Sequence, residues 1–316
     1  MTDTTKEIFN NYQVRRSKKQ KANFREYVKK ICESNNYEYN EEKGDFGARN
    51  IIIGNVDTAK VIYTAHYDTQ SMLPIPYIHM PKKPLLSLLL QVLMFLGLFT
   101  ILLTINKLIC LLLNFCGVND SIVNIVYHTL DICIWLWLIC FPFFGITNKH
   151  TANDNTSGVT TLIDIMTSLP VENRQNVAFV FFDLEELGLW GSRGFANKHK
   201  NVKENTLVIN FDCVSNGKKI LFVVSKKASN HLNLLKESFL PTSNIEVEFI
   251  SKGVHYPSDQ KHFKQGIGVA ALLKKGKIEY LSKIHSSKDT IYEEENIEYL
   301  VNGAKILIDK LNTDNK

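Results

Sequence analysis

Five short segments of the sequence each contain a side chain that is able to bind a metal ion. They are spread from residue 66 to residue 285, and the candidate ligands are His66, Asp154, Glu186, Asp212 and His285. Proteins hold Zn²⁺ in catalytic sites with imidazole and carboxylate groups of this kind. Two histidines and three carboxylates together predict a site for two zinc ions that hold and activate one water molecule.

Hydrolysis at such a site also needs a base and a fixed orientation of the ligands. Glu185 lies next to a candidate ligand. We expect it to act as the general base, taking a proton from water and passing it to the leaving amine. Asp68, two residues after His66, is expected to accept a hydrogen bond from the second ring nitrogen and orient the imidazole. Glu185 and Asp68 are therefore the predicted catalytic residues.

The expected coordination is arranged around one shared carboxylate. Asp154 precedes a predicted helix and is expected to bridge both ions through its two oxygens. Glu186 and Asp212 would complete the coordination, one on each ion, with His285 on the ion opposite His66. Three carboxylates leave two Zn²⁺ ions with one net positive charge, which a bound hydroxide would neutralise at neutral pH.

Most of these residues follow a predicted β-strand. Nearly continuous apolar runs predict buried strands at 60–65, 176–182 and 206–211, which lead into His66, Glu185–Glu186 and Asp212. In open α/β sheets, sites form outside the carboxyl ends of the strands. Further strands are predicted at 37–40, 50–53, 220–224, 245–250 and 268–273, and helices at 156–169, with Thr156 and Ser157 as caps, and at 292–312.

Longer stretches around these residues resemble the co-catalytic dizinc exopeptidases, the family of bacterial leucyl aminopeptidase and glutamate carboxypeptidase II. The matching stretches are Thr64–Thr69, Ala152–Gly158, Phe182–Gly188 with Gly191–Ser192, Ile209–Asp212, Ser258–Asp259, Phe263 with Gly266–Ile267, and Ile284–Thr290. The resemblance implies a mixed, mostly parallel sheet of eight strands flanked by helices. It also implies the same five zinc ligands, with Glu185 as base and Asp68 as the orienting residue.

Three residues depart from the family pattern. Gln260 and His262 stand where the family often has His followed by Pro, and Ser286 replaces a frequent Thr. The first difference affects the expected contacts with substrate. The family also includes glutaminyl cyclases with a single zinc ion, and the presence of His66 favours two ions here.

An apolar insert separates His66 from Asp154. Residues 85–105 contain no charge, and residues 122–146 are interrupted only by His128 and Asp131; each stretch is long enough to cross a bilayer. Because the flanking ligands must meet, the chain must return to its starting side. We therefore expect residues 81–146 to form a transmembrane helical hairpin, with lipid contacts over residues 85–146, inside a catalytic domain made of residues 1–80 and 147–316.

Two alternatives concern this insert. A hairpin buried within a soluble domain is the first, although so many leucines are hard to cover in a domain of this size. The second concerns Lys107 and Asp131, which lie equally far from Asn119. They are hypothesised to pair inside the membrane; alternatively, Lys107 reaches the outer interface and Asp131 stays neutral.

Flanking charges predict the orientation in the cell membrane. Lys82, Lys83 and Lys149 flank the catalytic side, and the turn at 117–121 has no Lys or Arg. The positive-inside rule then places the catalytic domain in the cytoplasm. The N-terminus lacks the apolar core of a signal peptide, and the six cysteines show no disulfide framework. The expected location is the cell membrane, crossed by two helices.

The remaining charge does not indicate nucleic acid as a partner. The net charge is +5, with much of it in residues 15–30, and no base-reading motif accompanies it. Phe24, Tyr27, Val28 and Ile31 form an apolar stripe in this stretch, which predicts a helix whose basic face is solvated. Contact of that face with anionic lipid is the alternative. No obligate protein partner is evident.

These observations predict a membrane-anchored zinc aminopeptidase that hydrolyses N-terminal residues from peptide substrates. A carboxypeptidase or amidohydrolase on the same site is an alternative, because metal ligands do not determine which end of a peptide binds. A catalytically silent membrane scaffold is the other alternative. Loss of a ligand would mark that state, and none of the five is lost.

Overall fold

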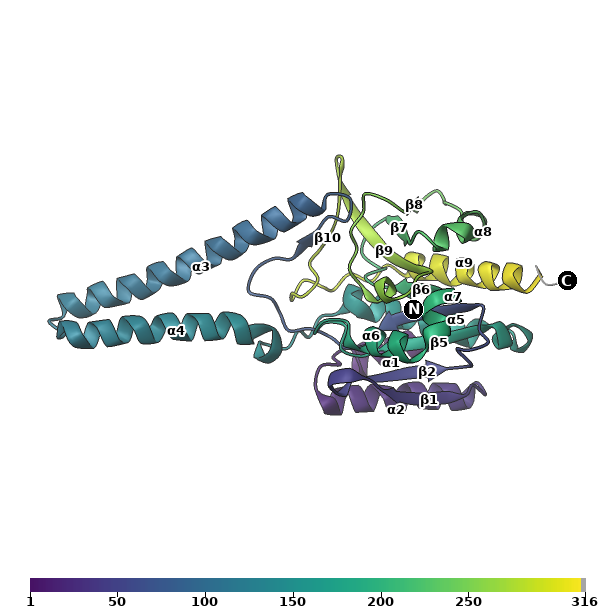
Figure 1. Cartoon of the computed structure of the whole chain (residues 1–316), viewed down its shortest axis with the longest axis horizontal. Helices are drawn as coiled ribbons and strands as arrows, with labels where there is room; N and C mark the ends of the chain where they lie inside the picture. Colours follow the sequence, from purple (N-terminus) through teal and green to yellow (C-terminus); the bar gives the residue numbers. More distant parts are fainter. Residues whose placement is uncertain (314–316) are drawn as a thin grey trace.

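The computed structural model describes residues 1–313 of the chain. It consists of an α/β domain and a pair of long helices, α3 and α4, that project from one side of it (Figure 1). The domain is assembled from chain segments on both sides of the helix pair.

A mixed sheet of ten strands forms the centre of the domain. Its order is β1-β2-β5-β3-β6-β9-β10-β4, with β7 also paired to β9 and β8 paired to β7. The four central strands, β5, β3, β6 and β9, run parallel to one another. The bounds are β1 Tyr39–Lys43, β2 Arg49–Ile53, β3 Val61–His66, β4 Ile78–His79, β5 Val177–Phe182, β6 Leu207–Phe211, β7 Lys219–Val224, β8 Glu246–Ile250, β9 Gly266–Lys275 and β10 Ile278–Ser282.

The predicted fold class is confirmed, and the expected number of eight strands is wrong. All eight predicted strands are present, and β4 and β10 are additional. The strand β4 has only two residues, too few to show a period of two. The strand β10 is mostly half-exposed, so it lacks the continuous apolar run of the central strands.

Helices cover both faces of the sheet. On one face, α1, α2, α5 and α9 pack against inward side chains such as Val61 and Tyr63; on the other, α6 and α7 pack against Ile62 and Val208. Alternation of neighbouring residues between the faces is the geometry of a strand buried on both sides. The helices are α1 Asp3–Asn11, α2 Lys18–Ser34, α5 Ser157–Ser168, α6 Trp190–Lys198, α7 Lys200–Asn205, α8 Leu232–Ser238 and α9 Glu294–Thr313.

The start of α5 differs from the expectation of a simple cap. Neither Thr156 nor Ser157 caps it with a side chain. A π-turn over Ala152–Thr156 precedes the helix. The hydroxyl of Ser157 donates to the carbonyl of Asn153 (2.7 Å) and accepts from the amide of Val214 (3.1 Å). The hydroxyl of Ser157 therefore fixes the turn that contains Asp154.

The basic run at 15–30 is only partly solvated, which corrects the predicted solvated face. Arg15, Lys21 and Arg25 are buried. Lys21 pairs with Asp183 at 2.7 Å, and the guanidinium of Arg25 donates to the hydroxyl of Tyr67 at 3.0 Å. The reason is that α2 packs beside the acidic end of β5, where buried carboxylates need cationic partners.

The two apolar helices of the insert are exposed over their length. The first, α3, spans Pro84–Phe115, and the second, α4, spans Asp120–Phe144. Both are long and apolar enough to cross a membrane, and their most apolar windows are 0% and 6% buried. The alternative of a hairpin buried inside the domain is therefore wrong, because the described chain does not cover these helices (Figure 1).

The two helices of the hairpin contact each other through one hydrogen bond and one pair of aromatic rings, among other contacts. The side-chain amide of Asn106 donates to the carbonyl of Tyr127 at 3.1 Å, and the rings of Phe99 and Trp135 lie 4.8 Å apart. In this register Asp131 lies about one helical turn from the level of Lys107. Among the described residues these two form no ion pair with each other, so the hypothesised pair is wrong. The reason is that α4 already begins at Asp120, so the turn covers residues 116–119 and its centre lies before Asn119.

Candidate metal centre

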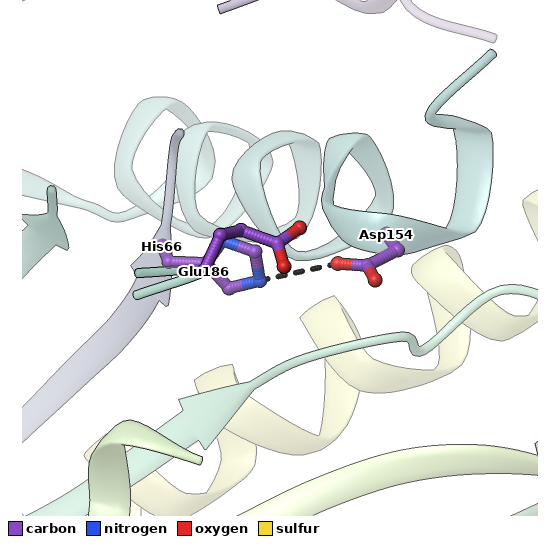
Figure 2. Close-up of side chains that lie close together, drawn as sticks. All are labelled: His66, Asp154 and Glu186. Atoms are coloured by element: carbon purple, nitrogen blue, oxygen red, sulfur yellow. Dashed lines mark ion pairs between the residues drawn. The ribbon is translucent and has the colours of Figure 1, made fainter. Parts of the chain in front are cut away.

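The structure brings all five predicted ligands to one place at the carboxyl ends of the parallel strands. His66 is the last residue of β3, and Asp212 directly follows β6. Glu186 lies in the loop after β5, Asp154 in the π-turn before α5, and His285 in the loop after β10. Figure 2 shows His66, Glu186 and Asp154 facing one another although they come from three separate segments.

Asp154 lies between the two histidine rings. Its Oδ1 is 3.3 Å from Nε2 of His66, and its Oδ2 is 2.8 Å from Nε2 of His285. Nε2 of His66 is also 3.6 Å from a carboxylate oxygen of Asp212, and Nε2 of His285 is 3.2 Å from one of Glu186. The contacts form two groups of three ligands, and both groups share Asp154.

The chemistry of this set of ligands fits zinc. Ligand atoms of His66, Asp154 and Glu186 lie within 4.8 Å of one another. Oε1 of Glu186 is buried without a hydrogen-bond partner. A buried carboxylate oxygen needs a proton, a donor or a cation. Imidazoles and carboxylates with such a free oxygen are what a zinc ion binds.

The pKa values of the cluster link its protonation to metal binding. Burial alone would lower the pKa of His66 and of His285, but the surrounding carboxylates raise both well above the usual value. Burial raises the pKa of Glu186 to about 7. Without metal the two rings therefore retain protons at neutral pH. Because metal ligands must be deprotonated, metal binding at this site releases protons.

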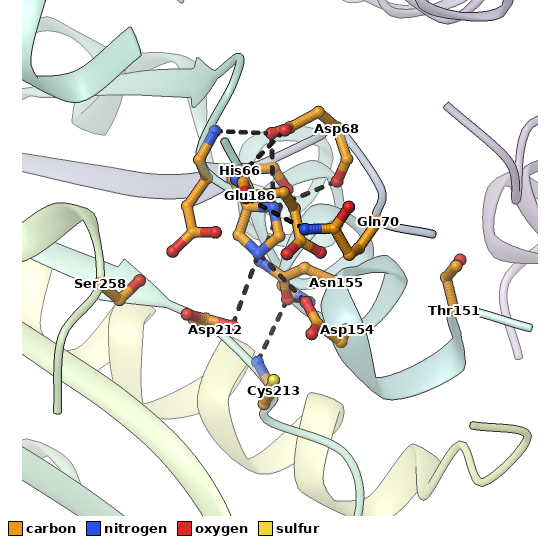
Figure 3. Close-up of polar contacts among 12 residues, drawn as sticks. His66, Asp68, Gln70, Thr151, Asp154, Asn155, Glu186, Asp212, Cys213 and Ser258 are labelled. Carbon is orange, nitrogen blue, oxygen red and sulfur yellow. Dashed lines mark hydrogen bonds and ion pairs between the residues drawn. The ribbon is translucent and has the colours of Figure 1, made fainter. Parts of the chain in front are cut away.

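The loop that carries Glu185 and Glu186 is held by Asp68. The Asp68 carboxylate accepts hydrogen bonds from the backbone amides of Glu185 (3.0 Å) and Glu186 (3.3 Å). Gln70 donates to the carbonyl of Glu186 at 3.1 Å. Figure 3 shows this arrangement around His66.

The contact between Asp68 and the ring of His66 differs in detail from the prediction. Nδ1 of His66 is 3.2 Å from the carbonyl oxygen of Asp68 and 3.6 Å from its carboxylate. The carbonyl is therefore the nearer acceptor. Asp68 positions a predicted ligand with its backbone and the predicted base with its side chain.

Glu185 lies beside the cluster and lines one cavity together with the predicted ligands. Burial, together with the negative charges of Asp212 and Glu186, raises its pKa well above the usual value, although His66 opposes this. A carboxylate with a raised pKa suits proton transfer near neutral pH. Its position is therefore compatible with the role of general base.

A layer of hydrogen bonds behind the cluster fixes the backbone around Asp154. Asp289 accepts from the amides of Asn153 (2.8 Å) and Asp154 (3.0 Å) through its two oxygens. Asn155 accepts from the amide of Cys213 at 3.3 Å (Figure 3). The sequence assigned no role to Asp289, although it lies in the matched stretch Ile284–Thr290. Its four-residue spacing from His285 was the available signal.

Arg15 is a second residue that the sequence did not single out. It is fully buried and donates to Thr156 Oγ1 at 3.3 Å and to the carbonyl of Tyr12 at 2.7 Å. Burial lowers its pKa to about 10, and the charges of Asp68 and Asp154 oppose that change. The buried guanidinium therefore offsets part of the negative charge around the site. Its place within a basic run concealed this role.

The backbone adopts left-handed conformations beside the cluster. Leu184, Cys213 and His285 have φ angles of 56°, 57° and 54°. Each is a predicted ligand or lies within two residues of one. Such conformations are costly for residues other than glycine and concentrate at functional sites.

A cavity of about 80 Å³ opens onto the cluster. Besides the predicted metal ligands and Glu185, its lining residues are Tyr77, His79, Cys213, Tyr256, Pro257, Leu281 and Ile284. The ring of Tyr77 stacks on that of His285 with centroids 5.3 Å apart. The sequence did not indicate Tyr77 or His79, because the two-residue strand β4 and the residue before it carry no motif.

Two of the residues that depart from the family pattern lie outside this cavity. Gln260 is buried behind β6, where it donates to the carbonyl of Tyr256 at 2.8 Å and accepts from the side chain of Asn210 at 3.2 Å. Burial lowers the pKa of His262 to about 4. Neither lines the cavity, so these two substitutions leave its described wall intact.

The chain matches a known protein family. Residues 142–305 match the family described as peptidase family M28. A comparison with curated proteins finds no match.

Solved structures with the same fold include peptidases and cyclases. The Legionella pneumophila LapA aminopeptidase is 13% identical, with a TM-score of 0.56, covering 98% of this chain and 70% of that chain. A Porphyromonas gingivalis glutaminyl cyclase is also 13% identical, with a TM-score of 0.56, covering 98% and 100%. A leucine aminopeptidase precursor from Bacteroides thetaiotaomicron is 12% identical, with a TM-score of 0.54, covering 96% and 95%. At these identities the likeness concerns the fold.

Proposed function

The chain belongs to peptidase family M28, and from that premise we propose that it is a membrane-anchored, zinc-dependent aminopeptidase. It removes N-terminal residues from peptides and uses two zinc ions. The single observation that carries this proposal is the position of Asp154 between His66 and His285, with one carboxylate oxygen towards each ring.

Each of the two groups of ligands would hold one zinc ion. His66, Asp154 and Asp212 form one group; His285, Asp154 and Glu186 form the other. Bound zinc polarises the scissile carbonyl and lowers the pKa of water.

The remaining steps belong to the residues of the chain. Glu185 takes a proton from the attacking water and delivers it to the leaving amine. Asp68 keeps Glu185 in place by accepting the hydrogen bond of its backbone amide. The acidic groups around the cluster attract the α-amino group of the substrate.

The size of the cavity supports action at a chain end. A volume of about 80 Å³ corresponds to roughly three water molecules at their share of liquid volume. A peptide terminus enters such a space more readily than the middle of a chain. Glu185, the lining carboxylate that is not a predicted zinc ligand, favours the positively charged N-terminus over the C-terminal carboxylate.

The test uses the full chain in lipid nanodiscs with the variant Glu185→Gln. We expect turnover of peptides with a free N-terminus to fall about 10²–10⁴-fold, the usual contribution of a general base. Zinc should stay near two ions per chain by elemental analysis. Glu172→Gln, at an exposed position of the domain, is the matched control and keeps wild-type turnover.

Different substrates separate the alternatives. Cleavage restricted to N-blocked peptides with a free C-terminus would identify a carboxypeptidase. Cyclisation of an N-terminal glutamine without hydrolysis would identify a cyclase, the activity named for one of the structural neighbours. A catalytically silent scaffold would leave every peptide intact even with both zinc ions bound.

We further propose that residues 81–146 anchor the enzyme as a two-helix hairpin, with the domain formed by 1–80 and 147–316 in the cytoplasm. The exposed apolar helices and the flanking lysines support this arrangement. Cys116, exposed between the helices, tests it directly. A membrane-impermeant maleimide added to intact cells should label Cys116, and Cys116→Ser should abolish that label. Labelling only after lysis would place the catalytic domain outside.

A further inference from the structure

The first two turns of α3 are bonded to the strand that lines the candidate site. Only four residues separate β4 from α3. The hydroxyl of Ser87 donates to the carbonyl of Ile78 at 3.1 Å and accepts from the amide of Met80 at 3.2 Å. The side chain of Gln91 donates to the same carbonyl at 3.3 Å. The start of the apolar helix is thus fixed relative to Tyr77 and His79.

A second cavity of about 530 Å³ lies between this part of α3 and the domain. It is lined mostly by apolar surface, and the lining residues are Tyr77, His79, Pro84, Leu85, Ser87, Leu88, Gln91, His255 and Pro257. Tyr77, His79 and Pro257 also line the cavity at the metal centre. The two cavities therefore meet across these three side chains.

The length of α3 places the second cavity at the membrane surface. The helix has 32 residues, and a bilayer core needs about 20. About 12 residues therefore remain outside the hydrocarbon. Ser87 and Gln91 join the first two turns of α3 to β4 by hydrogen bonds. These two turns therefore belong to the residues outside the hydrocarbon, beside the domain.

We propose that this second cavity, between the start of α3 and the domain, is a substrate groove for the apolar residues that follow the scissile bond. The inference rests on the proposed function and names its substrate class: hydrophobic peptides that lie at the membrane surface. Their charged N-terminus enters the acidic cavity at the metal centre, and their apolar side chains stay against Leu85 and Leu88.

The chemistry and size of the groove determine this choice of occupant. An apolar peptide concentrates at the interface of the bilayer, where the groove opens, whereas a polar peptide does not. Several apolar side chains fit a volume that is far larger than the 80 Å³ at the metal centre. Burial of the substrate's apolar side chains in the groove adds binding energy at a distance from the scissile bond.

The test compares two substitutions in adjacent residues of α3, with the full chain in nanodiscs. Leu88 lines the groove, whereas Leu89 is 52% exposed and does not line it. The substrates are a peptide with Ala followed by three leucines and one with Ala followed by three serines. Leu88→Gln should lower the ratio of the two kcat/KM values about 10-fold, the lower end of hydrophobic-pocket discrimination. Leu89→Gln should leave the ratio at its wild-type value.

A second readout does not depend on turnover. A leucine peptide carrying a photoreactive diazirine, bound to the Glu185→Gln variant, should cross-link to residues 84–91. Cross-links confined to other segments would overturn the groove. Equal ratios for the Leu88→Gln and Leu89→Gln variants would also overturn it.

Two further outcomes separate this inference from the proposed function. If wild-type enzyme with zinc hydrolyses neither peptide while the cross-links form as expected, the proposed function fails and the groove stands. Preferential cleavage of an N-acylated amino acid over the leucine peptide would overturn the peptide as occupant in favour of an acyl chain.

Discussion

The catalytic domain and the hairpin place apolar and polar side chains in opposite ways. In the domain, Ile62 and Val208 are fully buried within the sheet layers. In the hairpin, Leu93 and Leu96 are 53% and 50% exposed, whereas the polar Asn106 is 2% exposed. An exposed apolar face and a polar helix contact are typical of a chain that is surrounded by lipid rather than water.

A buried asparagine side chain forms a hydrogen bond to a backbone carbonyl in both regions. In the domain, Asn155 donates to the carbonyl of Phe211 at 3.0 Å. In the hairpin, Asn106 donates to a carbonyl of the partner helix at 3.1 Å. These two buried amides are therefore paired, and the regions differ in how far their apolar side chains are exposed.

The largest expected effect comes from removing the charge at the centre of the domain. Asp154→Asn leaves the two histidines without their shared carboxylate, so zinc content should fall below one ion per chain. Zinc at 100 times its Kd should stabilise the wild type by about 2.7 kcal/mol and the variant by much less. Thermal melting with and without zinc measures this. Asp57→Asn, at a side chain that is 72% exposed, should respond to zinc like the wild type.

A charge on the exposed face of the hairpin tests whether lipid surrounds it. Ile101 is 59% exposed. Ile101→Arg should cost about 2.5–3.5 kcal/mol in a bilayer, and less than about 0.5 kcal/mol if water surrounds the helix. The yield of protein in the membrane fraction measures the difference. Val171→Arg, in the domain at 73% exposure, should be tolerated. Equal yields for both variants would contradict a lipid environment.

The carboxylate of Asp164, which is largely buried in the domain, gives a pH-dependent prediction. Burial raises the pKa of Asp164 to about 6, although Thr2 donates a hydrogen bond to it at 3.2 Å. The folded state binds this proton more tightly than the unfolded state, so stability falls as pH rises from about 4 to 6. Asp164→Asn should gain about 2 kcal/mol above pH 6 and little below pH 4. Melting temperatures at pH 4 and pH 8 measure this, and a gain that is equal at both would contradict it.

The smallest expected effect lies within the hairpin. Asn106→Leu removes the hydrogen bond to α4 and should cost about 0.6 kcal/mol, the average for such contacts in membrane proteins. Unfolding by titration with a denaturing detergent measures it. Asn114→Leu, at an exposed position near the end of α3, is the matched control. A loss of equal size in both variants would show that polarity, not the helix contact, is responsible.

Much of the fold was predictable because its strands are buried on both faces. The runs that became β3, β5 and β6 are nearly continuous in apolar residues, which marks a parallel strand directly. The short strand β4 carries no such signal, since its position depends on pairing with β10. Its omission also concealed the groove, because β4 fixes the start of α3.

The proximity of His66, Glu186 and Asp212 was predictable for a related reason. Side chains at the carboxyl ends of neighbouring parallel strands share one edge of the sheet. Asp289 and Arg15 were not predictable in this way, because each acts through bonds with segments more than a hundred residues away in the sequence. The basic run was misinterpreted because charge alone does not reveal which cations meet a buried carboxylate.

The position of β3 has a consequence for the order of events during translation. Both of its partners, β5 and β6, come later in the chain than the hairpin. The ribosome therefore completes α3 and α4 before the central strand has any neighbour with which to pair. Under the proposed anchoring, insertion of the two helices precedes closure of the sheet, and the catalytic centre forms only after the chain is tethered.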